Sequence, residues 1–255
     1  MSEIEWIEGN SIEIVDLITN ESVDLVYIDP PFNTGKTQSL ARTKDYKEFV
    51  GIERSYEDSF DDYWGWMFPL LKDIHRILKA EGSLFLHLDW REAHYAKVYL
   101  DIIFGRGNFQ NEIIWAYDYG GRSKKKWSSK HDTIFWYSKH PKKYTFNFDE
   151  MDRIPYMAPG LVGPEKAARG KTPTDVWWHT IVPTNGKERT GYPTQKPLGV
   201  LKRIINVHTN PGDLVVDLFA GSGTTGEACK ILDRNCILVD CNPEAIEVIK
   251  ERINK

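Results

Sequence analysis

The chain has 255 residues, 41% of them hydrophobic, and a formal net charge of −4 at pH 7. This length and composition suit one large α/β domain over residues 1–255. No run of 18 apolar residues occurs, and the N-terminal "MSEIEWIEGN" lacks the basic and apolar regions of a signal peptide, so we expect a cytoplasmic protein without membrane contact.

Short apolar runs bounded by turn residues predict strands that alternate with helices. The expected strands are 23–28, 82–88, 111–117, 132–138, 213–219 and 235–240, and the expected helices are 61–80, 91–105, 197–209, 223–232 and 243–253. Glycines are typical of helix ends, so we expect the first helix to end at Gly82 and the second at Gly105. The alternation indicates βαβ units and a doubly wound, mostly parallel sheet with helices on both faces.

The segment between the two halves of this pattern is irregular and basic. Regular patterning fades from Tyr144 to Tyr192, where proline, glycine and tryptophan accumulate. From Asp118 to Lys196 there are 15 basic and 8 acidic residues, a net charge of +7 inside an acidic chain. A long irregular stretch is typical of a functional insertion, and this charge asymmetry indicates a polyanion-binding face. We therefore predict a basic insertion over residues 118–191.

The three cysteines, Cys229, Cys236 and Cys241, are an odd number and include no CxxC pair. This pattern disfavours both a disulfide framework and a zinc site. We expect reduced thiols in the core and no metal.

A glycine-rich turn follows the predicted strand in "LVVDLFAGSGTTG". Gly221, Gly223 and Gly226 have the G-x-G-x-x-G spacing, which lets backbone approach a ligand at a helix N-terminus. The next strand ends about 20 residues later in Asp240, placed to accept hydrogen bonds from ribose hydroxyls. No lysine follows Gly226, which disfavours a nucleoside triphosphate. A dinucleotide, S-adenosylmethionine and a tight turn without ligand all remain open.

The stretch "LVYIDPPFNTGK" places an acid directly after a buried strand. Two prolines follow Asp29 and fix the backbone of its loop. In a doubly wound sheet, ligands bind beyond the carboxyl ends of strands, where the strand order reverses. If strand 23–28 lies beside strand 214–218, Asp29 faces the glycine-rich turn across that crevice.

Three motifs in a fixed order resemble the DNA amino-methyltransferases: "DPPF" at 29–32, "YPTQKPLGVLKRIINVHTNPGD" at 192–213 and "DLFAGSGTTG" at 217–226. The catalytic block precedes the cofactor block, which is the circularly permuted order of the β group. The resemblance implies a Rossmann-like, S-adenosylmethionine-dependent methyltransferase fold that flips a base out of double-stranded DNA and methylates its exocyclic amine. It also implies that "EIEWIEGNS" (3–11) supplies the strand beside 235–240.

The family pattern assigns the chemistry to the "DPPF" loop. The Asp29 carboxylate and the Pro30 carbonyl would accept the two amine hydrogens, Pro31 would fix the loop, and Phe32 would stack on the flipped base. Aspartate at the first position favours the N6 amine of adenine, with the N4 amine of cytosine as the alternative. No cysteine lies near this loop, which excludes methylation of cytosine C5.

The resemblance also implies a cofactor site. Its residues would be Asn10, where the family commonly has aspartate, Lys196 at the methionine end, and Asp217, Phe219, Gly221, Ser222, Gly223, Thr224, Thr225 and Asp240.

The basic insertion and the loop at 33–60 would face the DNA. The predicted phosphate contacts are Arg122, Lys124, Lys125, Lys126, Lys130, Lys187 and Arg189. A solvated loop is the alternative for 122–130, and Trp177 and Trp178 are equally consistent with core anchors.

The resemblance leaves a cognate restriction endonuclease and a homodimer open as partners. Three other functions compete with DNA methylation: a nicotinamide-dependent oxidoreductase, a catalytically silent DNA-binding subunit, and methylation of RNA.

Overall fold

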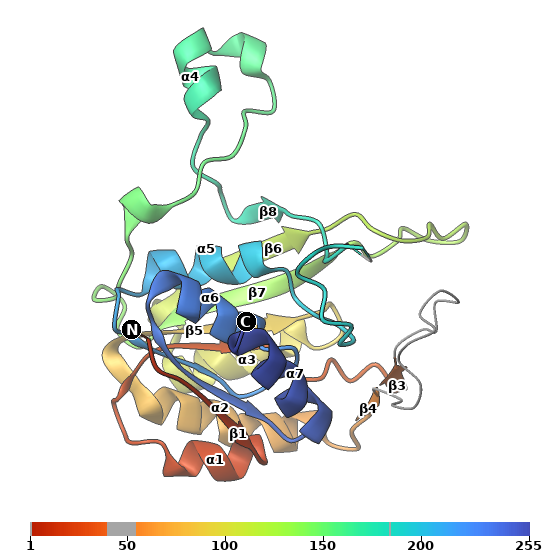
Figure 1. The fold of residues 1–255 in the computed structure, drawn as a ribbon, viewed down its shortest axis with the longest axis vertical. Helices are drawn as coiled ribbons and strands as arrows, with labels where there is room; N and C mark the ends of the chain where they lie inside the picture. The colour runs from red at the N-terminus through yellow and green to blue at the C-terminus, as the bar shows by residue number, and fades with distance from the viewer. Residues whose placement is uncertain (1, 40–54, 184) are drawn as a thin grey trace.

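The computed structural model describes residues 2–39, 55–183 and 185–255, and these residues form one eight-stranded sheet beside a two-stranded one (Figure 1). The strands of the large sheet are β1 (Ile4–Glu8), β2 (Val23–Ile28), β5 (Leu78–Leu88), β6 (Phe109–Ala116), β7 (His131–Ser138), β8 (Val176–Trp178), β9 (Leu214–Asp217) and β10 (Asn235–Asp240). Their order is β1-β10-β9-β2-β5-β7-β6-β8. Within this described sheet only β7 is antiparallel to its neighbours, so the predicted mostly parallel α/β fold is confirmed.

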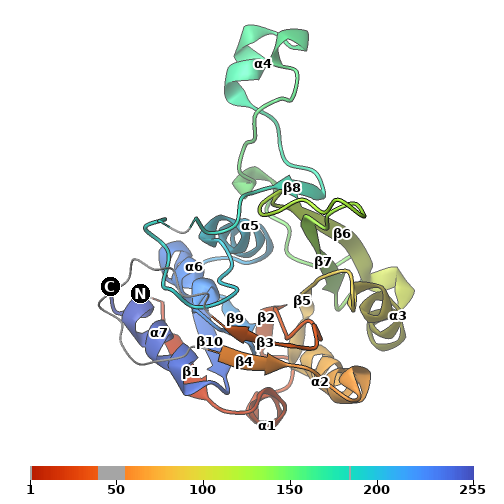
Figure 2. The ribbon, with the colours of Figure 1, turned by 90° about the vertical axis from the view of Figure 1, so that its right-hand side faces the viewer.

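Helices cover both faces of the sheet (Figure 2). They are α1 (Ser11–Leu17), α2 (Tyr63–Ile77), α3 (Ala93–Phe104), α4 (Pro164–Arg169), α5 (Leu198–His208), α6 (Thr224–Leu232) and α7 (Pro243–Ile253), with short 3₁₀ helices at Arg106–Asn108, Phe148–Glu150 and Pro159–Leu161. Helices α1, α2 and α3 pack on one face in one apolar cluster, and α5, α6 and α7 pack on the other face in a second cluster. None of the described helices is both long enough and apolar enough to cross a membrane.

Local sequence signals explain why α2 forms where it does. The Asp62 side chain caps the helix by accepting the Gly65 N–H at 2.8 Å, which satisfies one of the unpaired amides of the first turn. Met67, Leu70 and Ile74 recur at three- and four-residue spacing and are fully buried. The apolar face of the helix therefore packs onto the sheet and orders strand β5 beside β2.

The strand order reverses between β2 and β9, which pair in parallel through Leu25–Val215 and Val26–Val216. The chain leaves β9 through α6 on one face and leaves β2 through α2 on the other face. Because the two connections diverge, a crevice opens beyond the carboxyl ends of these strands. The predicted neighbourhood of strands 23–28 and 214–218 is thus confirmed, and Asp29 and Asp217 lie at this edge.

The predicted end of the first long helix is wrong. The helix ends at Ile77, because Leu78 already pairs with Val23 and begins β5. Gly82 lies inside β5 at a register shift, where an added Cβ would be 3.0 Å from the Val23 carbonyl oxygen. This glycine therefore serves a close approach between two strands, and it does not cap a helix.

The N-terminal strand and the hairpin were predicted correctly. Strand β1 pairs in parallel with β10 in register from Ile4–Cys236 to Glu8–Asp240. Strands β6 and β7 pair antiparallel, and the basic segment connects them. Of the loop predicted at 33–60, residues 40–54 lie outside the described residues, and its flanks form the small sheet of β3 (Lys36–Ser39) and β4 (Ser55–Asp58).

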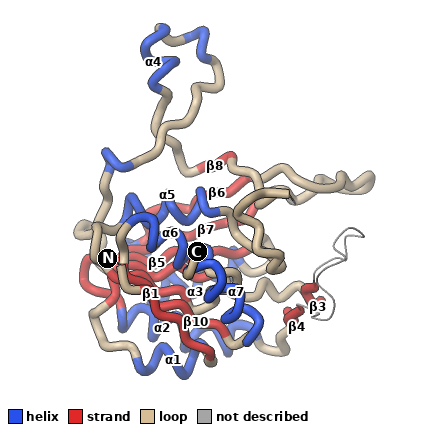
Figure 3. Tube along the Cα trace, in the orientation of Figure 1, coloured by secondary structure: helices blue, strands red, loops and turns tan. Residues whose placement is uncertain are grey.

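Part of the insertion leaves the body of the molecule as a finger, mostly loop, that carries α4 near its tip (Figures 1 and 3). A bridge between Ile154 and Lys171 joins its two arms. Strand β8 returns the chain to the sheet edge beside β6. There Trp177 is a core anchor, buried with Arg203 over its ring at 4.8 Å, whereas Trp178 is 71% exposed.

Candidate active site

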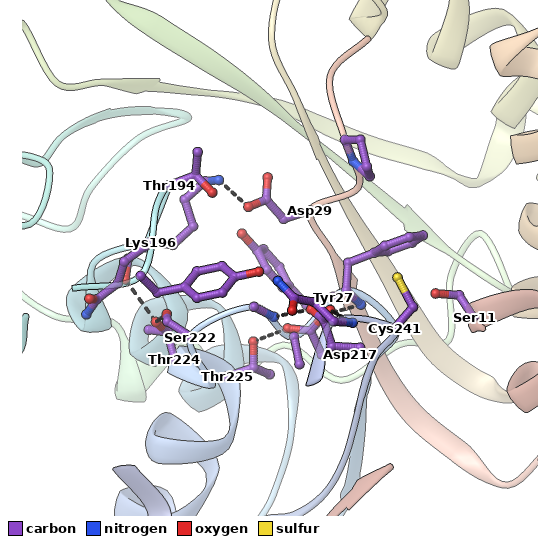
Figure 4. Close-up of a pocket in the computed structure, with 18 of the residues that line it drawn as sticks. Ser11, Tyr27, Asp29, Thr194, Lys196, Asp217, Ser222, Thr224, Thr225 and Cys241 are labelled. Carbon is purple, nitrogen blue, oxygen red and sulfur yellow. Dashed lines mark hydrogen bonds and ion pairs between the residues drawn. The ribbon is translucent and has the colours of Figure 1, made fainter. Parts of the chain in front are cut away.

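A cavity of about 370 Å³ opens at the carboxyl ends of β2, β9 and β10 (Figure 4). The cavity therefore occupies the crevice where the strand order reverses. Most of the predicted cofactor residues line it, namely Asn10, Lys196, Asp217, Phe219, Gly221, Ser222, Thr224, Thr225 and Asp240.

The glycine-rich turn uses two glycines in the left-handed region for different purposes. Gly221 has φ +48°, and an added Cβ would be 3.2 Å from the Tyr192 ring at the cavity wall. Gly223 has φ +73° and caps α6, where an added Cβ would be 3.0 Å from the Ile249 side chain. The structure thus places Gly221 in the cavity and Gly223 behind the turn, against α7.

Asp217 is buried below the turn and organises it. Its carboxylate accepts the Thr225 hydroxyl and, at 3.0 Å, the Phe219 N–H. Burial raises the pKa of Asp217 to about 7, against the lowering effect of these two hydrogen bonds. This side chain is therefore balanced between its neutral and charged forms near neutral pH.

Asp240 ends β10 and borders the cavity from the other side. Its two oxygens accept the backbone N–H groups of Gly221 at 2.8 Å and Asn242 at 2.9 Å. Burial raises the pKa of Asp240 above its ordinary value. Asn10 caps α1 by accepting the Ile12 N–H at 2.9 Å. The carboxylate oxygens of Asp240 and the amide oxygen of Asn10 can each accept a second hydrogen bond, from a hydroxyl or amine of a ligand.

The catalytic candidate Asp29 is held by an ion pair. Its Oδ2 accepts a hydrogen bond from the Lys196 ammonium, which also lies 5.2 Å from the centre of the Phe32 ring. Its Oδ1 is buried and has no hydrogen-bond partner among the described residues. A buried acceptor without a donor is costly, so this oxygen is poised to accept an N–H group from a substrate.

Lys196 joins the two halves of the site. It was predicted at the methionine end of a cofactor, and the structure places it in the cavity wall with its ammonium on Asp29. Its carbonyl accepts the Thr224 hydroxyl at 3.0 Å, which ties it to the start of α6. Pro31 also lines the cavity, Pro30 is buried beside it, and Phe32 is half-buried.

His87 lies beneath Asp29 and was missed from the sequence. Its Nδ1 is 2.9 Å from the Tyr27 hydroxyl and 4.0 Å from Asp29 Oδ1, and its Nε2 is 3.3 Å from Asp132 Oδ2. Burial, and secondarily the charge of Asp29, raise the pKa of Tyr27 well above its usual range, so its hydroxyl stays protonated. The only sequence signal was a single histidine in the apolar run "GSLFLHL".

The sequence did not predict the other residues that line the cavity individually. Tyr192, Pro193, Thr194 and Gln195 precede Lys196 in "YPTQKP" and form one wall. Further lining residues are Ser11, Tyr27, Phe60, Trp66, Leu201, Ala220, Cys241 and Asn242. Cys229 and Cys236 are buried as expected, but Cys241 is exposed, because it is the first residue after β10 at the open edge.

The residues predicted to contact DNA lie on two segments, the β6–β7 hairpin and the loop before "YPTQKP". Lys124, Lys125 and Lys126 are exposed in the β6–β7 hairpin. Arg122 pairs with Asp118 at 2.7 Å, and Lys130 donates to the Tyr119 carbonyl. Lys187 and Arg189 are exposed in the loop that leads into the "YPTQKP" wall.

Comparisons with known proteins agree with this geometry. The family model described as DNA methylase (N6_N4_Mtase) matches residues 23–251. The chain is 34% identical to the type II methyltransferase M.HpaI of Haemophilus parainfluenzae, over 96% of this chain and 73% of that protein. It is 32% identical to the DNA adenine methyltransferase YhdJ of Escherichia coli (strain K12), over 97% of this chain and 82% of that protein.

Solved structures share the fold. The PvuII DNA methyltransferase (cytosine-N4-specific) superposes with a TM-score of 0.69 at 20% identity, covering 99% of this chain and 86% of that one. The complex of M1.HpyAVI with SAM superposes with a TM-score of 0.66 at 22% identity, covering 99% and 100%. The family match over most of the chain, together with the two relatives above 30% identity, shows that this protein belongs to the N6/N4 DNA methylase family.

Proposed function

We propose that this protein transfers a methyl group from S-adenosylmethionine to the N6 amine of an adenine that has been flipped out of duplex DNA. The observation that carries the proposal is the buried Oδ1 of Asp29, which lines the cavity and has no hydrogen-bond partner among the described residues. It offers a negatively charged acceptor at the place where an exocyclic amine must meet a methyl donor.

The charges around the cavity fit S-adenosylmethionine better than a dinucleotide. The wall carries three carboxyl groups, of Asp29, Asp217 and Asp240. Within the described part of the chain, the wall has one cation, Lys196, and it already pairs with Asp29. Such a wall favours a sulfonium cation and repels a pyrophosphate. The complex of M1.HpyAVI with SAM supports the same choice.

The residues present would hold this cofactor along the wall. Asp240 would accept ribose hydroxyls, and Asn10, Phe219 and Asn242 would surround the adenine end. When bound, S-adenosylmethionine supplies an electrophilic methyl group on sulfur. Asp29 and Pro31 of the "DPPF" loop line the same cavity, so a cofactor bound there would have its methyl group within reach of that loop.

The chain activates the amine by accepting its hydrogens. The lone pair of an aromatic exocyclic amine is drawn into the ring, so the amine is a weak nucleophile. Asp29 Oδ1 accepts one N–H and the Pro30 carbonyl accepts the other, which favours tetrahedral nitrogen with its lone pair directed at the methyl carbon. As the N–C bond forms, the bond from the methyl carbon to sulfur would break and S-adenosylhomocysteine would leave. The nitrogen would then be positively charged and would release a proton toward the Asp29 carboxylate. Phe32 stacks on the base and holds it in plane.

The choice of adenine rests on aspartate at position 29 and on the name of one relative. The Escherichia coli relative YhdJ is called a DNA adenine methyltransferase. Cytosine N4 is the second candidate, because the PvuII enzyme with the same fold is cytosine-N4-specific. We further infer the permuted β-group order, target recognition by the basic insertion at 118–191, and a restriction endonuclease as cognate partner, since several relatives are type II methyltransferases.

The test is the identity of the methylated base. The protein is expressed in bacteria that lack their own DNA methyltransferases, and genomic DNA is digested to nucleosides for mass spectrometry. N6-methyldeoxyadenosine is the expected product. N4-methyldeoxycytidine would select the second candidate, and unmethylated DNA would contradict the proposal. Modification-sensitive sequencing of the same DNA identifies the recognition motif.

A further inference from the structure

The tip of the β6–β7 hairpin carries a tryptophan in water. Trp127 is 98% exposed, although tryptophan is usually well buried in folded proteins. The loop around it is ordered by its own hydrogen bonds: the Ser123 N–H donates to Ser128 Oγ at 2.7 Å, and the Lys125 N–H donates to Ser123 Oγ at 3.1 Å. The indole therefore plays no part in packing this chain, and its exposure at the tip of an ordered loop indicates that it contacts a binding partner.

The topology places this hairpin at the edge of the sheet that carries the catalytic site. Strand β6 runs parallel to β5 and β2, because both β5 and β6 are antiparallel to β7. The carboxyl end of β6 at Ala116 therefore lies on the same edge as Asp29. The return strand is tied to the site directly, since Asp132 near the start of β7 bonds to His87 beneath Asp29. Figure 1 shows the hairpin extending outward from this side of the molecule.

The charge around Trp127 indicates what it meets. Lys124, Lys125 and Lys126 precede it and have no carboxylate partner in the described part of the chain. Residues 122–130 contain no acid at all. A flat aromatic side chain next to several cations is suited to bind a nucleic acid, because the cations can pair with phosphates and the ring can stack on a base.

We propose that Trp127 inserts into the duplex and occupies the space that the target base leaves when it flips. This role rests on the proposed function, in which Asp29 can reach the amine only on an extrahelical base. Flipping costs the stacking and pairing of that base, and the cost is smallest where the base is already unpaired. An inserted aromatic side chain recovers stacking with the neighbouring bases.

The test compares Trp127→Ala with Trp127→Phe on two duplexes that carry the recognition motif. In the first duplex the target adenine is paired with thymine, and in the second it lies opposite an abasic site. Methyl transfer is measured at saturating S-adenosylmethionine, and flipping is followed by the fluorescence of 2-aminopurine at the target position. Thermal unfolding of both variants should match the wild type, because the replaced ring is exposed.

For Trp127→Ala we expect kcat/KM on the paired duplex to fall about tenfold or more, as expected when one stacking interaction is removed. The 2-aminopurine signal should fall with it. On the abasic duplex the same variant should stay within about twofold of the wild type, and Trp127→Phe should stay near wild type on both. The exposed Trp178 provides the matched control, because Trp178→Ala should leave the ratio between the two duplexes unchanged.

Two results would overturn this role. Unchanged activity of Trp127→Ala on the paired duplex would show that the ring is not inserted. An equal loss on both duplexes would make it a general DNA contact. If the wild-type protein methylates neither duplex, the proposed function itself fails, which differs from either of these results.

Discussion

The buried carboxyl group of Asp217 is expected to make the fold less stable as pH rises. Burial raises its pKa to about 7 in the folded protein, from an ordinary value of 3.8. Between these two values the unfolded chain has released a proton that the folded chain still holds. The free energy of unfolding contributed by this group is therefore greatest below pH 3.8 and falls as pH rises through 7.

The magnitude follows from the separation of the two pKa values. A difference of about three units corresponds to about 4 kcal/mol of lost stability at pH 8, and to about 1.5 kcal/mol at pH 5. Asp217→Asn carries no charge at any pH. Its amide can still accept the Phe219 N–H and can donate to the Thr225 hydroxyl, so both contacts of the carboxyl group have replacements. The stability advantage of the variant over the wild type should therefore shrink by about 2.5 kcal/mol between pH 8 and pH 5.

Urea denaturation followed by tryptophan fluorescence at pH 5 and pH 8 measures this change. The matched control is Asp16→Asn, whose side chain is 66% exposed and which should alter the unfolding free energy by less than about 0.5 kcal/mol at either pH. A stability difference between Asp217→Asn and the wild type that does not depend on pH would show that the pKa of Asp217 is not raised by burial.

Three further predictions concern binding. Gly221→Val should reduce S-adenosylmethionine affinity at least about 100-fold, because a branched side chain at φ +48° is strained and points at the cavity wall; tight binding by calorimetry would remove the cofactor from this turn. Replacing lysines 124–126 by alanine should weaken DNA binding equally on all sequences. The slope of log affinity against log salt should become shallower by about 0.9 for each phosphate that is no longer neutralised, and an unchanged slope would show that these lysines make no phosphate contacts. Cys241 is exposed as a residue, but partial burial of its thiol raises the pKa of that thiol, so its alkylation by iodoacetamide should be slow. S-adenosylhomocysteine should slow the alkylation further, and peptide mass spectrometry showing equal labelling with and without this ligand would contradict the assignment of the cavity.

The crevice was predictable because its parts are local in sequence. Each strand of the switch point is a short apolar run with an aspartate at its carboxyl end: Asp29 directly follows β2, and Asp217 is the last residue of β9. Parallel strands bring their carboxyl ends to one edge, so two motifs that are far apart in the chain had to meet there. The glycine spacing located the turn, and both Gly221 and Gly223 have positive φ in the structure.

The contacts within the site were not predictable, because they join residues that no local pattern connects. The apolar run around His87 predicts burial, but its partner Asp132 belongs to a different strand. The ammonium of Lys196 pairs with Asp29, which is 167 positions away. The end of α2 was misplaced for a similar reason, since it is set by strand pairing at Leu78 and a local glycine signal could not show that.

In the proposed chemistry, Asp29 accepts a hydrogen of the target amine and does not hold the cofactor. The most direct test is single-turnover methyl transfer by Asp29→Ala on duplex DNA, together with the Kd for S-adenosylmethionine measured by calorimetry on the same preparation. Loss of transition-state stabilisation without loss of cofactor binding predicts a rate at least about 1000-fold lower, with Kd within about fivefold of the wild type. A variant that keeps more than about a tenth of the wild-type rate, or one that loses activity only through weaker cofactor binding, would show that Asp29 does not have this role.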